Sequence, residues 1–175
     1  SWNYNLFKTN INTENSDFGL SFYDNDKVVF ASSQDATGSK KFKWSNEPFL
    51  DLFTAQIDSL GNLFVCDTGN NCVRRIDHAT KEVSTFAGSD SRGFKDGSAN
   101  VACFSLPFGI AVDSHDDVFV ADTWNNRIRK IDHETREVST FAGSGERDFK
   151  DGPGSEACFH DPDGMAFDSR DNLYV

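Results

Sequence analysis

Hydrophobic and polar positions form short alternating segments along this chain, and no stretch shows helical periodicity over two turns. Residues 109–113 and 117–121 are apolar runs separated by the turn at 114–116. Residues 127–131 alternate charged and apolar side chains, as a half-buried strand does, and residues 138–142 form a fourth short run. The pattern predicts four consecutive antiparallel strands joined by tight turns.

The same pattern occurs twice. Residues 67–89 return with few changes as residues 122–144, at an offset of 122 − 67 = 55 residues, and residues 94–97 return as 149–152. A long period of this kind is typical of proteins built from one stackable supersecondary unit. Four strands in a unit of about 55 residues predict an all-β fold, a β-propeller of four-stranded antiparallel blades. The two most apolar strands of each unit are expected nearest the ring axis.

A family resemblance follows from residues 108–131. They read Phe-Gly-Ile-Ala-Val-Asp, then a turn, then Val-Phe-Val-Ala-Asp-Thr-Trp-Asn-Asn-Arg-Ile-Arg-Lys-Ile, which resembles an NHL repeat, a β-propeller blade. The resemblance extends over roughly residues 53–175. It implies NHL-like blades at 53–107 and 108–162, and the first strands of a further blade at 163–175.

The N-terminal part, residues 1–52, has a different pattern, interpreted as a divergent first blade. It resembles the propeller-like repeats of bacterial OmpA-family outer-membrane proteins through Asp-Phe-Gly at Asp17 and Asn-Glu-Pro-Phe at Asn46. The peptidoglycan-binding domain of that family is absent, so its function is not carried over. The strands expected here are residues 16–23, 27–34 and 46–58.

The junction between the two parts suggests a chimera. Residues 53–65 overlay residues 108–120 without a gap (108 − 53 = 55), although Thr54 and Gln56 depart from the NHL pattern. One interpretation is a recombination of two propeller families, in the laboratory or in nature. A divergent natural first blade is the alternative.

Ring closure is the second open question. Dividing 175 by 55 gives about 3.2 periods, whereas closed propellers have four to eight blades. Residues 3–9 could add an outer strand to the sheet begun by residues 164–168 and 172–175. Alternatively, two copies could self-associate as a homo-oligomer that completes the ring, and this alternative is slightly favoured.

The composition argues against several classes of binding partner. The formal net charge is −11 and no basic stripe occurs, which argues against nucleic-acid binding. No apolar run approaches the roughly 20 residues that span a bilayer, so no membrane insertion is expected. The four cysteines fit neither zinc-ligand spacing nor a disulfide framework and are expected to be buried free thiols: Cys66, Cys72, Cys103 and Cys158.

Charged residues have structural explanations. The acidic segments at 58–62, 113–117 and 168–172 are expected to be hairpin turns, since none has the spacing of an EF-hand calcium loop. The basic residues of the third strands are expected to pair with nearby acids across strands. These basic residues are Arg74, Arg75, Arg129 and Lys130, and the acids are Asp77, Glu82, Asp132 and Glu137.

The sequence therefore assigns no catalytic, cofactor-binding or metal-binding residue, and the favoured function is a non-catalytic scaffold or interaction module. A protein or small ligand would bind at the ring face. The turns at residues 67–71 and 122–126 are expected to be structural, with Asp and Asn side chains satisfying the turn backbone. The candidate contacts are Trp124, which stands where the preceding repeat has Gly69, and the asparagines Asn70, Asn71, Asn125 and Asn126.

Two other functions stay open. The chain could be a fragment of an NHL-type propeller enzyme, such as the peptidylglycine lyases, which work with metal at the ring axis. That function needs a histidine-rich centre, and the four histidines are dispersed at His78, His115, His133 and His160. The chain could also be a recombination product without a selected ligand.

Overall fold

A computed structural model describes residues 17–22, 27–32, 51–89 and 91–175, with side chains from Ala55 onward. The chain divides into two compact units, Ser1–Ala55 and Gln56–Val175, and each is described by itself. The described residues form β-strands and two single-turn 3-10 helices, with no α-helix among them. The all-β prediction is confirmed.

Where the structure describes it, the first unit forms an antiparallel hairpin. Strands β1 (Asp17–Phe22) and β2 (Lys27–Ser32) pair from Asp17 to Phe22, with an irregularity between Phe18 and Leu20. These strands fall within the segments predicted from sequence. Strand β3 (Asp51–Ile57) ends in the second unit, while residues 46–50 of the predicted third strand lie outside the described residues.

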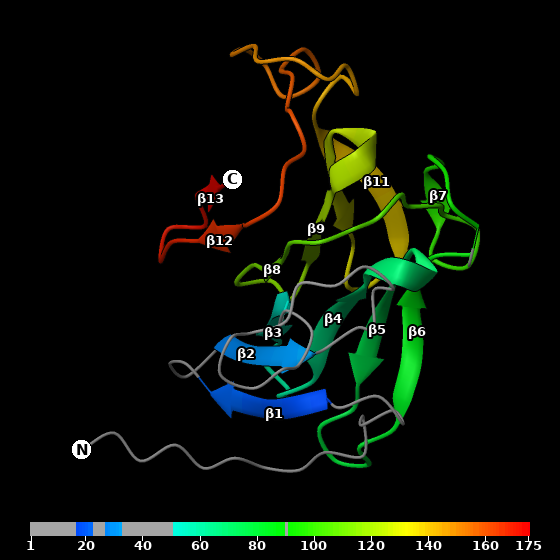
Figure 1. The fold of residues 1–175 in the computed structure, drawn as a ribbon, viewed down its shortest axis with the longest axis vertical. Helices are drawn as coiled ribbons and strands as arrows, with labels where there is room; N and C mark the ends of the chain where they lie inside the picture. The colour runs from blue at the N-terminus through cyan, green and yellow to red at the C-terminus, as the bar shows by residue number, and fades with distance from the viewer. Residues whose placement is uncertain (1–16, 23–26, 33–50, 90) are drawn as a thin grey trace, which may run out of the picture. The chain divides into compact units, whose positions relative to one another are not determined.

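The second unit begins with an antiparallel meander, β4 to β5 to β6 (Figure 1). Leu63 pairs with Ile76 and Val73 pairs with Ala87. The 3-10 turn η1 joins β4 to β5. The bounds are β4 Leu63–Asp67, η1 Thr68–Asn70, β5 Cys72–Ile76 and β6 Val83–Ala87.

A second sheet repeats this three-stranded meander and has one further strand at each edge. Its order is β7-β11-β10-β9-β8, and its last four strands are those predicted from the hydrophobic pattern. The edge strand β7 was not predicted; it comes from the connection between the two sheets. The bounds are β7 Gly97–Ser98, β8 Ile110–Val112, β9 Val118–Asp122, η2 Thr123–Asn125, β10 Arg127–Ile131 and β11 Glu137–Ala142.

A short hairpin follows the second sheet. Strands β12 (Ala166–Phe167) and β13 (Leu173–Tyr174) pair antiparallel, so that Phe167 lies opposite Leu173. The turn between them, at Asp168, has the same backbone hydrogen bonds as the turns at Asp58 and Asp113. The acidic segments are therefore hairpin turns, as the sequence predicted.

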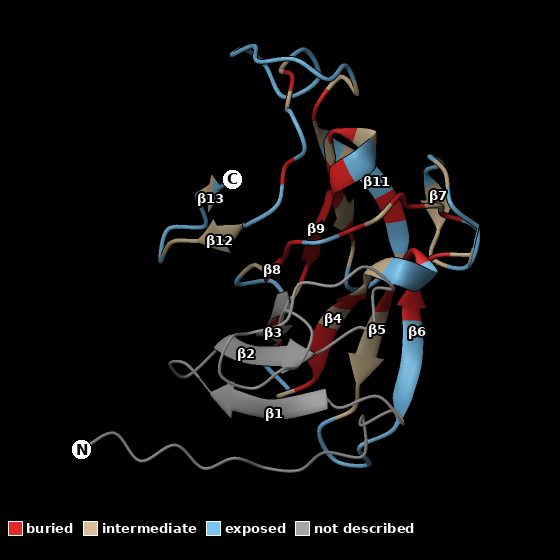
Figure 2. Cartoon of the chain, in the orientation of Figure 1, coloured by how far each residue is buried: buried red, intermediate tan, exposed pale blue. Residues whose placement is uncertain are grey.

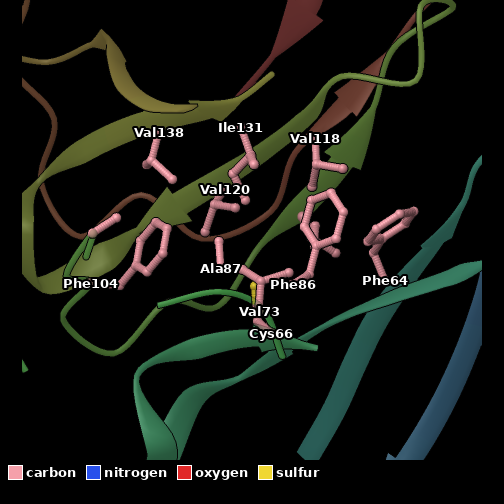
Figure 3. Close-up of a cluster of buried hydrophobic side chains, with 12 residues drawn as sticks. Phe64, Cys66, Val73, Phe86, Ala87, Phe104, Val118, Val120, Ile131 and Val138 are labelled. Atoms are coloured by element: carbon pink, nitrogen blue, oxygen red, sulfur yellow. The ribbon is translucent and has the colours of Figure 1, made fainter. Parts of the chain in front are cut away.

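The hydrophobic core lies between consecutive sheets. Figure 3 shows Phe64 and Phe86 of the first sheet facing Val118 and Val120 of the second, and the two phenylalanine rings meet edge to face at 4.6 Å. Neighbouring residues of β9 point to the opposite face. There Phe119 contacts Phe167 of the following hairpin, with ring centroids 4.9 Å apart. Alternation along β9 thus fills two cores, because successive side chains of a strand point to opposite faces.

The burial of the strands follows from this stacking. All five residues of β9 are buried, since its sheet is covered on both faces (Figure 2). Strand β6 begins with three exposed residues and ends with two buried ones. Strand β9 is thus far more enclosed than β6, in agreement with the more apolar sequence of β9.

Hydrogen bonds between hairpin turns link successive sheets. The Ser59 amide donates to the Asp116 carboxylate at 2.7 Å and the Ser59 hydroxyl donates to it at 2.5 Å. Ser114 makes the same two bonds to Asp171, at 3.2 and 2.5 Å. These bonds from Ser114 lower the pKa of the Asp171 carboxyl. The contacts between successive repeats therefore recur every 55 residues, as the strands within each repeat do.

Gly109 is explained by the close approach of the backbone at Asp163, in the following repeat. A Cβ at Gly109 would lie 1.7 Å from the carbonyl oxygen of Asp163, whereas a Cβ at Gly69 would meet no atom within 4 Å. We expect Gly109→Ala to lower the free energy of unfolding by about 1–3 kcal/mol, because backbone must move. Gly69→Ala should change it by less than about 0.5 kcal/mol. Urea unfolding of both variants tests this contact, and equal stabilities would contradict it.

Candidate functional site

The turn after β9 is held in place by hydrogen bonds of polar side chains. Asn126 has a left-handed backbone (φ 51), and its backbone N–H donates to the Thr123 carbonyl at 3.1 Å. The buried Asp122 carboxylate accepts from the Ser105 amide at 2.7 Å and from Asn125 Nδ2 at 2.8 Å. Burial raises the pKa of the Asp122 carboxyl, and the bonds from Asn125, Ser105 and Arg129 oppose that rise. The turn therefore has little freedom to move.

Arg129 completes this network from β10. Its side chain is fully buried, and Nη1 lies 2.8 Å from the Asp122 carboxylate and 3.1 Å from the Cys103 carbonyl oxygen. Nη2 donates to the Lys95 carbonyl at 2.9 Å and to the Asp96 carboxylate. One guanidinium thus ties the connection between the sheets to the centre of the second sheet.

The predicted pairing of Arg129 with Asp132 or Glu137 is wrong. Arg129 points into the connection at residues 95–104, which covers that face of β10 and offers carbonyl oxygens as well as a carboxylate. Lys130 forms an ion pair with Asp117 at 2.6 Å. In the first sheet Arg75 lies 3.2 Å from Asp77, one of the expected acids, but the two residues belong to the same strand end and do not pair across strands.

The four candidate asparagines use their amides within the fold. Asn71 Oδ1 accepts the Leu106 amide at 3.0 Å, and Asn126 Oδ1 accepts the Asp161 amide at 3.2 Å. Asn70 Nδ2 donates to Asp67 at 2.9 Å. Asn71 and Asn126 are buried, so their structural bonds leave little surface for a partner. Their role as partner contacts stays a prediction.

Asn125 combines a structural bond with a contact across the connection. Besides bonding Asp122, its Nδ2 donates to the Gly93 carbonyl at 2.8 Å. This bond brings the loop at residues 91–94 against the turn that carries Trp124. The loop and the turn form one surface.

Trp124 is the exposed residue of that surface, with 58% of its area accessible. The Arg92 guanidinium lies over its ring at 4.4 Å, and Arg92 Nε donates to the Ser105 hydroxyl at 3.0 Å. Phe94, at the end of this loop, is also exposed, and the Arg127 guanidinium lies 4.0 Å from the centroid of its ring. We call Trp124, Arg92 and Phe94 the Trp124 patch. Arg92 was not predicted from the sequence, because it lies in a polar loop without periodicity.

Other chemistry has little support in the described part of the chain. No group of three His, Cys, Asp or Glu residues there could hold a metal ion. Among the same residues, no helix is long and apolar enough to cross a membrane. None of the four cysteines forms a disulfide, as predicted, although Cys103 is only half-buried. Burial raises the pKa of the Cys66 thiol, which makes it a poor nucleophile.

Comparison with known proteins identifies the repeat. The NHL repeat family matches residues 104–131. NHL repeat-containing protein 2 of Bos taurus is 36% identical over 111 residues, which cover 62% of this chain and 15% of that protein. The chloroplastic protein SUPPRESSOR OF QUENCHING 1 of Arabidopsis thaliana is 42% identical over 72 residues, covering 41% of this chain and 7% of that protein. The chain thus spans a small part of these relatives.

Solved structures support the fold. A protein of unknown function from Bacteroides thetaiotaomicron matches with a TM-score of 0.66 and 22% identity, covering 85% of this chain and 41% of the other. An auxiliary nutrient binding protein from the same organism matches with a TM-score of 0.60 and 22% identity, covering 84% and 42%. The chain has a β-propeller fold and contains an NHL repeat. These matches lend no support to an OmpA-like part or to a chimera.

The buried ion pair gives a direct prediction on stability. Arg129→Ala removes a buried cation and leaves the Asp122 carboxylate uncompensated, so we expect a loss of about 3–5 kcal/mol in the free energy of unfolding. Arg74 is the equivalent residue of the first sheet (129 − 74 = 55) and is about one-third exposed, with Asp67 at 3.9 Å. Arg74→Ala should cost about 1 kcal/mol or less. Chemical denaturation measures the free energy of unfolding of both variants. Similar losses for Arg129→Ala and Arg74→Ala would contradict the role of Arg129 as a buried, compensated cation.

Proposed function

We propose that this chain is a non-catalytic binding module of the β-propeller type, and that it binds a protein segment at the Trp124 patch. The NHL repeat and the propeller fold are general architectures that serve many functions. The proposal therefore depends on the patch and on the chemistry of its side chains.

The observation that carries the proposal is an exposed tryptophan on a rigid turn. Residues 67–89 and 122–144 are close copies, yet Gly69 of the first turn is replaced by Trp124 in the second. The Asp122 network, with its bonds to Ser105 and Asn125, holds the turn whichever residue stands there. Exposing a large aromatic side chain has no benefit for folding in water. A partner that covers Trp124 would supply that benefit.

The patch favours a partner segment that combines a carboxylate with an apolar side chain. Tryptophan and arginine are the residues most enriched among interface hot spots. Arg92 places a cation beside the Trp124 ring, on a protein whose net charge is −11. An acidic group would pair with Arg92 while an apolar side chain covers the indole. Partners that are acidic throughout would be repelled by the rest of the surface.

Similar proteins are compatible with a binding role. Two of the solved structures with this fold are described as auxiliary nutrient binding proteins, from Bacteroides thetaiotaomicron and Bacteroides ovatus. Their identities of 22% and 16% make them guides to the fold alone. The choice of a protein segment as partner comes from the Trp124 patch itself.

Selection from a phage-displayed peptide library against the purified chain tests the proposal. We expect the selected peptides to contain Asp or Glu next to an apolar residue. Trp124→Ala should weaken their binding by about 30-fold, equivalent to ~2 kcal/mol at a hot spot. Arg92→Gln should weaken binding and reduce its dependence on salt concentration. Biolayer interferometry with synthetic peptides measures these changes.

Leu60→Ala is the matched control, because Leu60 is also a large apolar side chain exposed at a turn. It should leave peptide affinity unchanged. If selected peptides bind the Trp124→Ala and wild-type proteins equally well, the Trp124 patch is not the binding site and the proposal fails.

A further inference from the structure

Two arginines from different sheets of the second unit border one pair of aromatic rings. Arg75 is on β5, and Arg136 is in the turn between β10 and β11. Arg75 lies opposite Phe64 in the strand pairing, and the rings of Phe64 and Phe86 are 4.6 Å apart. The Arg136 guanidinium lies 3.7 Å from the centroid of the Phe86 ring. The fold thus brings two guanidinium groups to the same place.

Arg75 lies on the face of its sheet that meets the second sheet. Val73, two residues earlier on β5, is buried in the core that β5 shares with β9 (Figure 3). Side chains two residues apart on a strand point to the same face. Arg75 therefore points toward the sheet from which Arg136 comes, and all of these residues belong to the compact unit Gln56–Val175.

Arg136 is a half-buried cation without an acidic partner. Burial and the nearby Arg75 both lower the pKa of the Arg136 guanidinium. The ion pairs within the described part of the chain include none with Arg136. Arg129, by contrast, is buried against the carboxylates of Asp122 and Asp96. A cation that is partly removed from water is stabilised by a nearby negative charge, and Arg136 has a second cation instead.

Comparison of the two repeats shows that an acid is missing beside Arg75. Lys130 is its equivalent (130 − 75 = 55) and pairs with the Asp117 carboxylate at 2.6 Å. The equivalent of Asp117 is Asn62 (117 − 62 = 55), a neutral amide. Asn62 and Asp117 are held alike, since each accepts a backbone N–H from the turn after the third strand, at 3.0 and 2.7 Å. The first repeat therefore keeps the cation of this position and lacks its acid.

One other acid lies beside Arg75, and it does not cancel the charge of both arginines. Arg75 Nη2 lies 3.2 Å from the Asp77 carboxylate. That carboxylate also accepts the backbone N–H groups of Ala79 and Thr80, at 3.0 and 2.9 Å. Two guanidinium groups and one carboxylate leave a charge of 2 − 1 = +1, on a chain whose net charge is −11. The pair of arginines is thus a local positive site on an acidic protein.

Both arginines also keep hydrogen-bond donors that the described residues do not use. Arg75 uses Nη2 for Asp77, and Arg136 uses Nη2 for the Phe86 carbonyl. The Nη1 atom of each has no acceptor among the described residues. The Arg75 side chain is 34% exposed and Arg136 is half-buried, so a solute can approach these donors.

We propose that Arg75 and Arg136 bind a phosphate group between them. The planar guanidinium offers several N–H donors to phosphate oxygens, and arginine is favoured wherever phosphate is recognised. A phosphate monoester carries a charge of about −1.5 to −2 near neutral pH, so its attraction to a positive site exceeds that of a carboxylate. Bound phosphate would relieve the repulsion between the two arginines.

This site is separate from the Trp124 patch. Trp124 precedes β10 and Arg136 follows it, so the two residues lie at opposite ends of that strand. Phosphate binding and peptide binding are measured by different experiments, and each proposal can fail without the other.

Titration of the 175-residue chain with sodium phosphate, at constant pH and ionic strength, tests the proposal. Sodium chloride holds the ionic strength, and the Nε–Hε NMR signals of the arginines report on each guanidinium group. We expect saturable shifts of the Arg75 and Arg136 signals. The melting temperature should rise with phosphate concentration, because phosphate binds the folded chain. Sodium acetate should bind more weakly than phosphate.

Three substitutions should weaken phosphate binding. Arg75→Gln and Arg136→Gln should each reduce the affinity about tenfold, equivalent to ~1.4 kcal/mol. Asn62→Asp should weaken binding as well, because its carboxylate would pair with Arg75 as Asp117 pairs with Lys130. The second repeat shows that an aspartate at this position is compatible with the fold.

Arg147→Gln is the matched control, since Arg147 is also partly exposed and pairs with one carboxylate, that of Asp161. It should leave phosphate affinity unchanged. Circular dichroism establishes that each variant is folded. If Arg136→Gln does not fold because Phe86 loses its cover, Arg75→Gln and Asn62→Asp still decide the question.

The result that overturns the proposal is a wild-type chain whose Arg75 and Arg136 signals show no saturable shift. Phosphate affinity unchanged in both Arg75→Gln and Asn62→Asp overturns it too, as does acetate that binds as tightly as phosphate. Methyl phosphate distinguishes the source of the group. Binding equal to that of inorganic phosphate indicates a group carried by a larger molecule, and loss of binding indicates the free ion; both agree with a phosphate site.

Discussion

A single buried guanidinium joins two parts of this protein that are distant in sequence. Arg129 binds Asp122 of its own sheet, and it binds Lys95 and Cys103 of the connection that comes from the preceding sheet. A buried cation is costly unless charge and hydrogen bonds compensate it. The position of the connection is therefore coupled to the position of β10. The turn that carries Trp124 depends on the same network, since Asp122 holds it through Asn125.

Polar contacts and apolar packing have different roles between the two sheets. The connection at residues 88–106 accepts Arg129 from β10, the third strand of the second sheet. Hydrophobic side chains of β9 fill the cores on both faces of the second sheet. Stacking by area alone would allow neighbouring units to slide, because apolar contact is non-directional. The polar contacts of Arg129 and the Ser59–Asp116 bonds fix the register between units.

Much of this fold could be predicted from the sequence. The bounds of β10 are those given by the alternation of charged and apolar residues, and the hairpin turns follow from Asp and Asn. Periodicity could not reveal the partners of Arg129, because three of the four lie in a connection without a regular pattern: the Lys95 and Cys103 carbonyls and the Asp96 carboxylate. Strand β7 escaped prediction since two residues carry no period. Trp124 was found as an internal difference between repeats, whereas Arg92 had no such signal.

We infer that Arg129 and Asp122 act as one unit in stabilising the fold. A double-mutant cycle on the free energy of unfolding, with Arg129→Met, Asp122→Leu and the double variant, measures this most directly. Coupled residues in contact deviate from additivity by about 0.5–3 kcal/mol. We predict a coupling of about 2 kcal/mol or more, with the double variant more stable than the sum of single losses implies. Additive losses, within about 0.5 kcal/mol, would contradict the account.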